Sequence, residues 1–183
     1  YFAIMGVLGI LITLGYKYRF SAFAFAFMWS GVYLMQKTSY NNHYYLLMLL
    51  AFIMAMLPAN RDISLDSRLN PDFRSHSMYN YIRWIIILQL FIVYTYAAVA
   101  KLYGDWLDFS IIEILMRSKK DYFLIGDFLQ IKWVHKMVAG FGIFFDLLVI
   151  PALLWKPTRN IAFILSIFFH LFNSIVFQIG IFP

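Results

Sequence analysis

The sequence contains no cysteine, and only 13% of its residues are charged. The absence of cysteine excludes disulfide bonds, thiol catalysis and cysteine metal sites, and it leaves the redox compartment undetermined. The shortage of charge is more informative, because soluble domains carry about 25% charged residues. With 63% hydrophobic residues, a soluble fold would have too little polar sequence to cover its surface. A bilayer removes this problem because apolar surface can face lipid, and we therefore predict an integral membrane protein.

Sequence motifs of soluble enzymes are also missing. The chain has no glycine-rich phosphate loop, no nucleophile elbow and no His-Glu-x-x-His motif. Its four histidines are scattered at spacings that specify no metal site, so none is predicted. The net charge of +6 would favour nucleic-acid binding in a soluble protein, but here the basic residues lie between apolar segments. We therefore expect membrane lipid as a partner, and no nucleic acid.

Six apolar segments approach the length of about 20 residues that a membrane-spanning helix needs. They are residues 1–15, 20–36, 44–58, 82–102, 134–155 and 160–182. Residues 104–133 mix apolar clusters with lysine and arginine, which indicates an amphipathic segment in the membrane interface. The predicted fold class is all-α, a polytopic transmembrane helical bundle of about six spans. We expect residues 1–183 to form a single domain and, since residue 1 is not Met, a fragment of a longer protein.

Polar residues at membrane depth are candidates for a functional site, because ionisable groups in a span are costly. With six spans, successive loops lie on alternate sides of the membrane. Four polar residues then approach one level near the same interface: His43, Lys101, Asn173 and Gln178. His170 lies somewhat deeper in the last span. This convergence is the main indication of a site that the residues themselves provide.

Each of these residues also has a simpler interpretation. A lysine at a helix end, such as Lys101, often reaches outward to the lipid head groups. His170 is typical of an interhelical hydrogen bond, and His43 is typical of a loop or helix cap. Asp146 lies within the fifth segment, where it is expected to pair with a neighbouring polar group. These interpretations stay open at the level of sequence.

Three segments, in order along the chain, contain recognisable motifs. They are residues 37–46 (KTSYNNHYYL), 91–107 (FIVYTYAAVAKLYGDWL) and 167–183 (IFFHLFNSIVFQIGIFP). They resemble the K-T-x-x-N-N-H-x-Y-L, F-I-V-Y-x-x-A-G-x-K-K-L-x-x-D-W and F-H-x-x-N-S-x-x-F-x-I-G-x-F segments of the vitamin K-dependent gamma-glutamyl carboxylase family. The resemblance is to the horizontally transferred transmembrane domain that bacteria share with the animal enzyme. One departure is that the family's paired lysines are Ala100 and Lys101 here.

The resemblance implies a quinol-dependent membrane carboxylase. An enzyme of this family oxidises a reduced vitamin K-like quinol, here menaquinol or a similar quinol, with oxygen. The strong base that results removes a proton from the γ-carbon of a peptidyl glutamate, and carbon dioxide adds. The resemblance implies that Lys101 deprotonates the quinol and that His43 assists it. The residues expected to bind the quinol are His170, Asn173, Gln178 and Tyr94.

Other functions remain open at this stage. The animal enzyme has a large extramembrane region that binds its protein substrate, so we expect an extramembrane domain or other membrane subunits as partners. An alternative is a non-catalytic module that binds quinone or lipid, or that serves as an accessory subunit of a larger membrane complex. A third hypothesis is a fragment of a transporter, since six spans with buried polar groups also fit the class of transporters. We expect a multi-pass protein, in a bacterial inner membrane rather than the endoplasmic reticulum.

Overall fold

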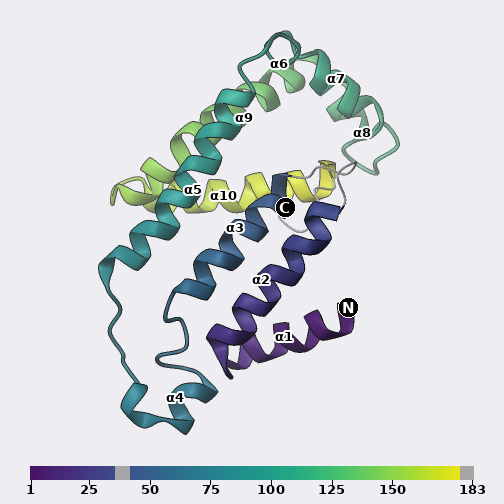
Figure 1. Ribbon diagram of the computed structural model, residues 1–183. Helices are drawn as coiled ribbons and strands as arrows, with labels where there is room; N and C mark the ends of the chain where they lie inside the picture. The colour runs from purple at the N-terminus through teal and green to yellow at the C-terminus, as the bar shows by residue number, and fades with distance from the viewer. Residues whose placement is uncertain (36–41, 178–183) are drawn as a thin grey trace. The chain divides into compact units, whose positions relative to one another are not determined.

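The computed structural model describes residues 1–35 and 42–177 (Figure 1). Within these ranges every regular element is a helix and none is a strand, which confirms the all-α prediction. The chain divides into two compact units, residues 1–86 (unit 1) and 87–183 (unit 2).

Unit 1 is built around one long helix with a neighbour on either side. Its main helices are α1 (Phe2–Leu14), α2 (Tyr18–Met35) and α3 (Asn42–Met56). Figure 1 shows α3 running alongside α2, and α1 also packs against α2. Ala22 and Ala26 of α2 and Ala55 of α3 are buried. Such small side chains let helix backbones approach closely in membrane proteins.

The remaining elements of unit 1 are short. After α3 come α4 (Leu65–Leu69) and the 3₁₀ turn η1 (Pro71–Phe73). The long helix α5 (Asn80–Ala100) then begins in unit 1 and continues into unit 2.

The turn between α1 and α2 is fastened by a residue from beyond α3. Gly15 ends α1 in the left-handed conformation, with φ of 64°. The carboxylate of Asp66 accepts hydrogen bonds from the backbone N–H groups of Lys17 (2.8 Å) and Tyr18 (3.0 Å) at the start of α2. The Asn60 amide also donates to it, at 2.6 Å. Asp66 therefore satisfies backbone donors that a helix N-terminus leaves without a partner.

These hydrogen bonds also set the ionisation of Asp66. Partial burial by itself raises the pKa of the carboxyl, but hydrogen bonds from Tyr18, Asn60 and Lys17 favour the charged form and outweigh it. The pKa of Asp66 is therefore lower than its ordinary value of 3.8.

Unit 2 contains two long helices that pack with the second half of α5. They are α9 (Lys132–Leu154) and α10 (Arg159–Phe172), and the π-helix η2 (Asn173–Phe177) extends α10. Phe145, Val149 and Ile150 of α9 form a buried cluster. Tyr94 of α5 and Phe169 of α10 pack against that cluster, so it joins three helices.

Three short helices form the arc between α5 and α9 in Figure 1: α6 (Gly104–Leu107), α7 (Ser110–Arg117) and α8 (Gly126–Leu129). The structure confirms the predicted amphipathic character here. Ile112 and Met116 of α7 are fully buried, whereas Glu113 and Arg117 form an exposed ion pair at 2.7 Å. The apolar face of α7 thus belongs to the core of unit 2.

All six predicted spans coincide with helices, but they differ in length. Within the described residues, three helices are long and apolar enough to cross a membrane: α5, α9 and α10 with its η2 extension. The helices α1 and α3 have 13 and 15 residues, fewer than the span of about 20 expected for a bilayer. The physical reason is that Gly15 and Pro58 lie at or just beyond the ends of these two helices. The number of six spans is therefore approximate.

Candidate functional site

Lys101 follows the last residue of α5, and its amine is held by groups from three elements. Nζ forms an ion pair with the carboxylate of Asp146 from α9. It also donates to the Ala97 carbonyl at 3.3 Å and lies 5.4 Å from the ring centroid of Trp106 in α6. The Lys101 side chain is 21% exposed and that of Asp146 only 4%. The amine is therefore directed at α9, and Asp146 has the polar partner expected for it.

A glycine in α9 makes room for this arrangement. A side chain at Gly142 would begin 3.7 Å from the Trp106 ring and 3.9 Å from Cε of Lys101. Both side chains therefore lie directly against the bare backbone at Gly142. The indole N–H of Trp106 donates to the Ala139 carbonyl at 3.2 Å, which fixes the ring against α9. Trp106 thereby covers one side of the lysine amine.

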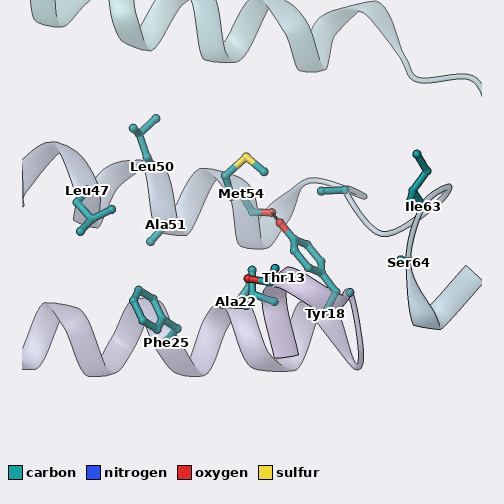
Figure 2. A pocket seen from close by; sticks show the side chains of 13 residues that line it. Thr13, Tyr18, Ala22, Phe25, Leu47, Leu50, Ala51, Met54, Ile63 and Ser64 are labelled. Atoms are coloured by element: carbon teal, nitrogen blue, oxygen red, sulfur yellow. Dashed lines mark hydrogen bonds between the residues drawn. The ribbon is translucent and has the colours of Figure 1, made fainter. Parts of the chain in front are cut away.

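A cavity of about 430 Å³ lies in unit 1, lined by α2, α3 and neighbouring segments (Figure 2). Three hydroxyl-bearing side chains line it, and each donates to a backbone carbonyl: Thr13 to Gly9, Tyr18 to Met54, and Ser64 to Asn60. The dashed line in Figure 2 marks the Tyr18 bond. With no charged side chain in its described lining, this cavity offers apolar packing rather than chemistry.

The cavity in unit 2 has a different lining. It measures about 640 Å³, and Lys101 and Asn173 are its polar members. We call it the Lys101 cavity. Its walls are otherwise apolar and largely aromatic, and they include Trp106, Trp133, Phe141, Phe168 and Phe172. Ligand sites commonly have about 300–1,000 Å³, apolar walls and a few placed polar groups. Two of the predicted site residues, Lys101 and Asn173, thus meet at one cavity.

Tyr94 and His170 form a second polar pair of unit 2. The Tyr94 hydroxyl and His170 Nε2 are 2.9 Å apart, which joins α5 to α10. The His170 ring also meets the edge of Phe169, a wall residue of the Lys101 cavity, with centroids 5.5 Å apart. Phe169 in turn stacks on Phe145 at 4.0 Å. Two of the four residues predicted to bind the quinol, Tyr94 and His170, therefore pack against Phe145 and Phe169, and their direct contact with a quinol stays a prediction.

A comparison with protein-family models matches the HTTM domain over residues 1–183. The chain belongs to the HTTM domain family. This domain is found in vitamin K-dependent gamma-carboxylase, so the resemblance of the three motifs is confirmed. No solved structure matches the chain. The HTTM match covers both compact units, and their forming a single domain stays a prediction.

The roles predicted for two further residues of this HTTM domain, His43 and Gln178, stay predictions. His43 lies in the first turn of α3 and belongs to unit 1, whereas Lys101 belongs to unit 2. The predicted approach of His43 to Lys101 therefore stays a prediction. Gln178 lies outside the described residues.

The sequence analysis did not identify two side chains that hold the Lys101 amine at the cavity, those of Asp146 and Trp106. Asp146 was expected to find a polar partner, but nothing in the sequence named Lys101, which lies 45 residues away. A tryptophan near a helix end is typical of an aromatic belt at the membrane interface, whereas the ring of Trp106 covers the amine of Lys101. The sequence feature that indicated such a pairing is the lone carboxylate of Asp146 inside an apolar segment, since a charge there needs a counter-charge.

The chemistry available to the HTTM site is proton transfer to or from a ligand in an apolar cavity. An amine at the cavity wall can donate to, or accept from, a hydroxyl group that approaches it. A carboxylate behind the amine gives the pair two positions for a proton. Low-dielectric surroundings strengthen these interactions relative to water.

Proposed function

We propose that this HTTM domain is part of a multi-pass membrane enzyme that binds a lipid-soluble quinol in the Lys101 cavity. The supporting observation is the position of the Lys101 amine in the wall of an otherwise apolar cavity of about 640 Å³. An apolar ring with hydroxyl substituents is complementary to such a lining, and the Asn173 amide can hydrogen-bond a second ring oxygen. Trp133, Phe141 and Phe168 line the cavity and are also exposed, which supports entry of the quinol from the bilayer.

In this proposal Lys101 removes a hydroxyl proton from the quinol. Asp146 and Trp106 hold the amine at the wall, so that a bound hydroxyl needs little further ordering to reach it. Reaction of the deprotonated quinol with oxygen would supply the strong base that removes a proton from a glutamyl γ-carbon, and carbon dioxide would add to the resulting carbanion. A protein substrate for that step would be held by an extramembrane domain or another subunit. We propose menaquinol as the natural quinol and a bacterial inner membrane as the location.

The test is quinol-dependent oxygen uptake by the purified protein in lipid nanodiscs. Lys101→Met keeps the length of the side chain and removes the amine. We expect it to lower oxygen uptake by at least about 100-fold, the scale of general acid–base catalysis. Lys132→Met is the matched control, because Lys132 is an exposed lysine at the start of α9. Equal uptake by parent and Lys101→Met would contradict the proposal.

One observation favours a non-catalytic quinone- or lipid-binding module. Asp146 neutralises the charge of Lys101. This ion pair would have a purely structural role if it did no more than join the end of α5 to α9. In that case the parent protein would bind quinol in the nanodisc and show no quinol-dependent oxygen uptake. Fluorescence quenching of Trp106 and Trp133, which line the cavity, measures the binding independently of turnover.

A further inference from the structure

Asp146 is a buried carboxylate inside a helix that is long and apolar enough to cross a membrane. It lies more than two helical turns from either end of α9, and only 4% of it is exposed. A charge in such surroundings is costly unless a partner neutralises it. Lys101 is that partner. The two side chains therefore form one unit whose net charge is zero when they share a single proton.

The two members of this pair differ in their access to the Lys101 cavity. Lys101 lines the cavity, whereas the carboxylate of Asp146 is not part of its described lining. The amine thus contacts the carboxylate and also faces the cavity. A ligand in the cavity meets the amine first, so Asp146 acts on a ligand through Lys101.

We infer that Asp146 is the positioning residue of this site, which fixes the Lys101 amine at the cavity wall and stores the proton that the amine must give up to become a base. The inference rests on the proposed function, since it concerns the step assigned to Lys101. Its physical basis is desolvation. When a quinol displaces water from the cavity, a carboxylic acid beside a neutral amine avoids two buried charges, so the shared proton moves to Asp146.

The proton count of this step balances within the site. Before the step, the shared proton is on a carboxyl oxygen of Asp146, and Nζ of Lys101 has a free electron pair. The O–H bond of the quinol then breaks, and a new N–H bond forms on Nζ. The lysine gains one positive charge and the quinol oxygen carries the matching negative charge. No proton is exchanged with bulk water.

Two other titratable side chains face Asp146 from neighbouring helices. Tyr94 of α5 and His170 of α10 both interact electrostatically with the carboxylate, and they are hydrogen-bonded to each other at 2.9 Å. Trp106 of α6 covers the amine and has no titratable group. Tyr94 and His170 are unchanged in every variant described below, so differences between those variants report on Asp146.

The test is the pH profile of quinol-dependent oxygen uptake under single-turnover conditions in nanodiscs. In the parent, the proton is stored inside the site, so we expect kcat to be nearly independent of pH between about 6 and 8. In Asp146→Asn, Lys101 must lose its proton to solvent instead. We expect kcat to fall by at least about tenfold at pH 7, and by about a further tenfold per unit as the pH is lowered.

Control variants separate this inference from a structural role and from the proposed function. Asp146→Glu keeps a carboxylate, and we expect a lower kcat with the flat profile of the parent. Asp105→Asn removes an exposed carboxylate of α6 and should leave both kcat and its pH dependence unchanged. Quinol binding, measured by tryptophan quenching, should be within about threefold of the parent in all three variants.

A kcat that is independent of pH in Asp146→Asn overturns the inference. A kcat that falls steeply with pH in Asp146→Glu overturns it as well, and this second result tests the inference if Asp146→Asn fails to fold. The proposed function fails on a different result, which is parental uptake by Lys101→Met. Loss of uptake in Lys101→Met together with a flat profile in Asp146→Asn would leave Lys101 as the base and remove Asp146 from the step.

Discussion

Gly142 shows how much of the candidate site depends on a single residue. Its bare backbone faces both Trp106 and Lys101. A Cβ added at Gly142 would lie 3.7 Å from the Trp106 ring and 3.9 Å from Cε of Lys101, which are ordinary van der Waals distances. Gly142 also lines the Lys101 cavity. A methyl group therefore fits at this position, whereas a longer side chain must occupy the cavity or displace the amine.

Substitutions at Gly142 test whether the Lys101 cavity binds the quinol. We expect Gly142→Leu to raise the KM for quinol by at least about tenfold, because about 1.4 kcal/mol of lost binding energy has that effect. Gly142→Ala should keep the parental KM and gain up to about 1 kcal/mol of stability, because glycine is unfavourable inside a helix. KM and the melting temperature in nanodiscs measure the two effects.

A matched control for this comparison lies on the same helix. Gly140 has open space where a Cβ would be, and it is not part of the described lining of the cavity. Gly140→Leu should therefore leave the KM unchanged. A parental KM in Gly142→Leu would show that the quinol binds elsewhere.

At the residue scale, the sequence analysis named two residues that line the cavity, but it did not name the partner of Lys101. Lys101 and Asn173 were both identified, and both line the cavity. The pairing of Lys101 with Asp146 was not predicted, because it depends on which faces of α5 and α9 meet. Periodicity does not show this in a span, since helices surrounded by lipid are apolar on every side. The predicted convergence of polar residues near one interface and the family motif both distinguished Lys101 from the other lysines.

The elements themselves were predicted well in number and less well in extent. All six apolar segments are helices, and their ends were recognisable where proline or charge interrupts them. The end of α1 at Gly15 was also visible in the sequence. The sequence did not show that Asp66 accepts hydrogen bonds from the turn after α1. Its partners Lys17 and Tyr18 lie 49 and 48 positions before it, and local patterns do not reveal contacts over such distances.

Asp66 gives a pH-dependent prediction for the stability of unit 1. Its folded pKa is lower than the ordinary value of 3.8, so the folded protein favours the charged carboxylate. The resulting stabilisation is fully present above about pH 4 to 5, and it is lost as the pH falls through the lowered folded pKa. We expect Asp66→Asn to be less stable than the parent by about 1 kcal/mol at pH 7, the cost of a weakened cap.

The measurement is the melting temperature of parent and variant in nanodiscs between pH 7 and pH 3. The difference between the two proteins should be constant down to about pH 5 and should shrink below pH 4, when the parent carboxylate also becomes neutral. Asp72→Asn is the control, because Asp72 is an exposed carboxylate of η1 and should have the parental profile. A difference that persists unchanged at the lowest pH would show that the charge of Asp66 is unimportant.

At the scale of the whole molecule, membrane topology follows from the long helices of unit 2. If α5 and α9 each cross the bilayer, the chain before α5 and the turn after α9 lie on one side. The arc of α6, α7 and α8 then lies on the other. The absence of cysteine makes this directly testable, since each introduced thiol is the only one in the given sequence.

Three exposed positions serve for labelling with a membrane-impermeant maleimide: Ser77 before α5, Ser118 after α7, and Lys156 after α9. We expect Ser77→Cys and Lys156→Cys to be labelled from the same side of sealed vesicles, and Ser118→Cys only from the opposite side. The cysteine-free parent is the background control. Labelling of all three from one side would contradict a multi-pass topology through α5 and α9.

The family and the helical class of the whole molecule could be predicted from sequence, whereas the convergence of His43 with Lys101 stays a prediction. The family followed from three ordered motifs, and the helical class followed from apolar composition, because a lipid-exposed backbone must satisfy its hydrogen bonds internally. His43 belongs to unit 1 and Lys101 to unit 2, so their approach depends on long-range packing, which neither motif nor composition encodes.

The link from Asp66 to the start of α2 has a consequence for the order in which the protein is made. Tyr18 leaves the ribosome 48 residues before the carboxylate that caps its helix. At about 5–20 residues per second, the start of α2 is synthesised about 2–10 seconds before that cap exists. Until Asp66 has been synthesised, the backbone N–H groups of Lys17 and Tyr18 therefore lack this hydrogen-bond partner. The turn after α1 can therefore gain these hydrogen bonds only after α3 has been synthesised.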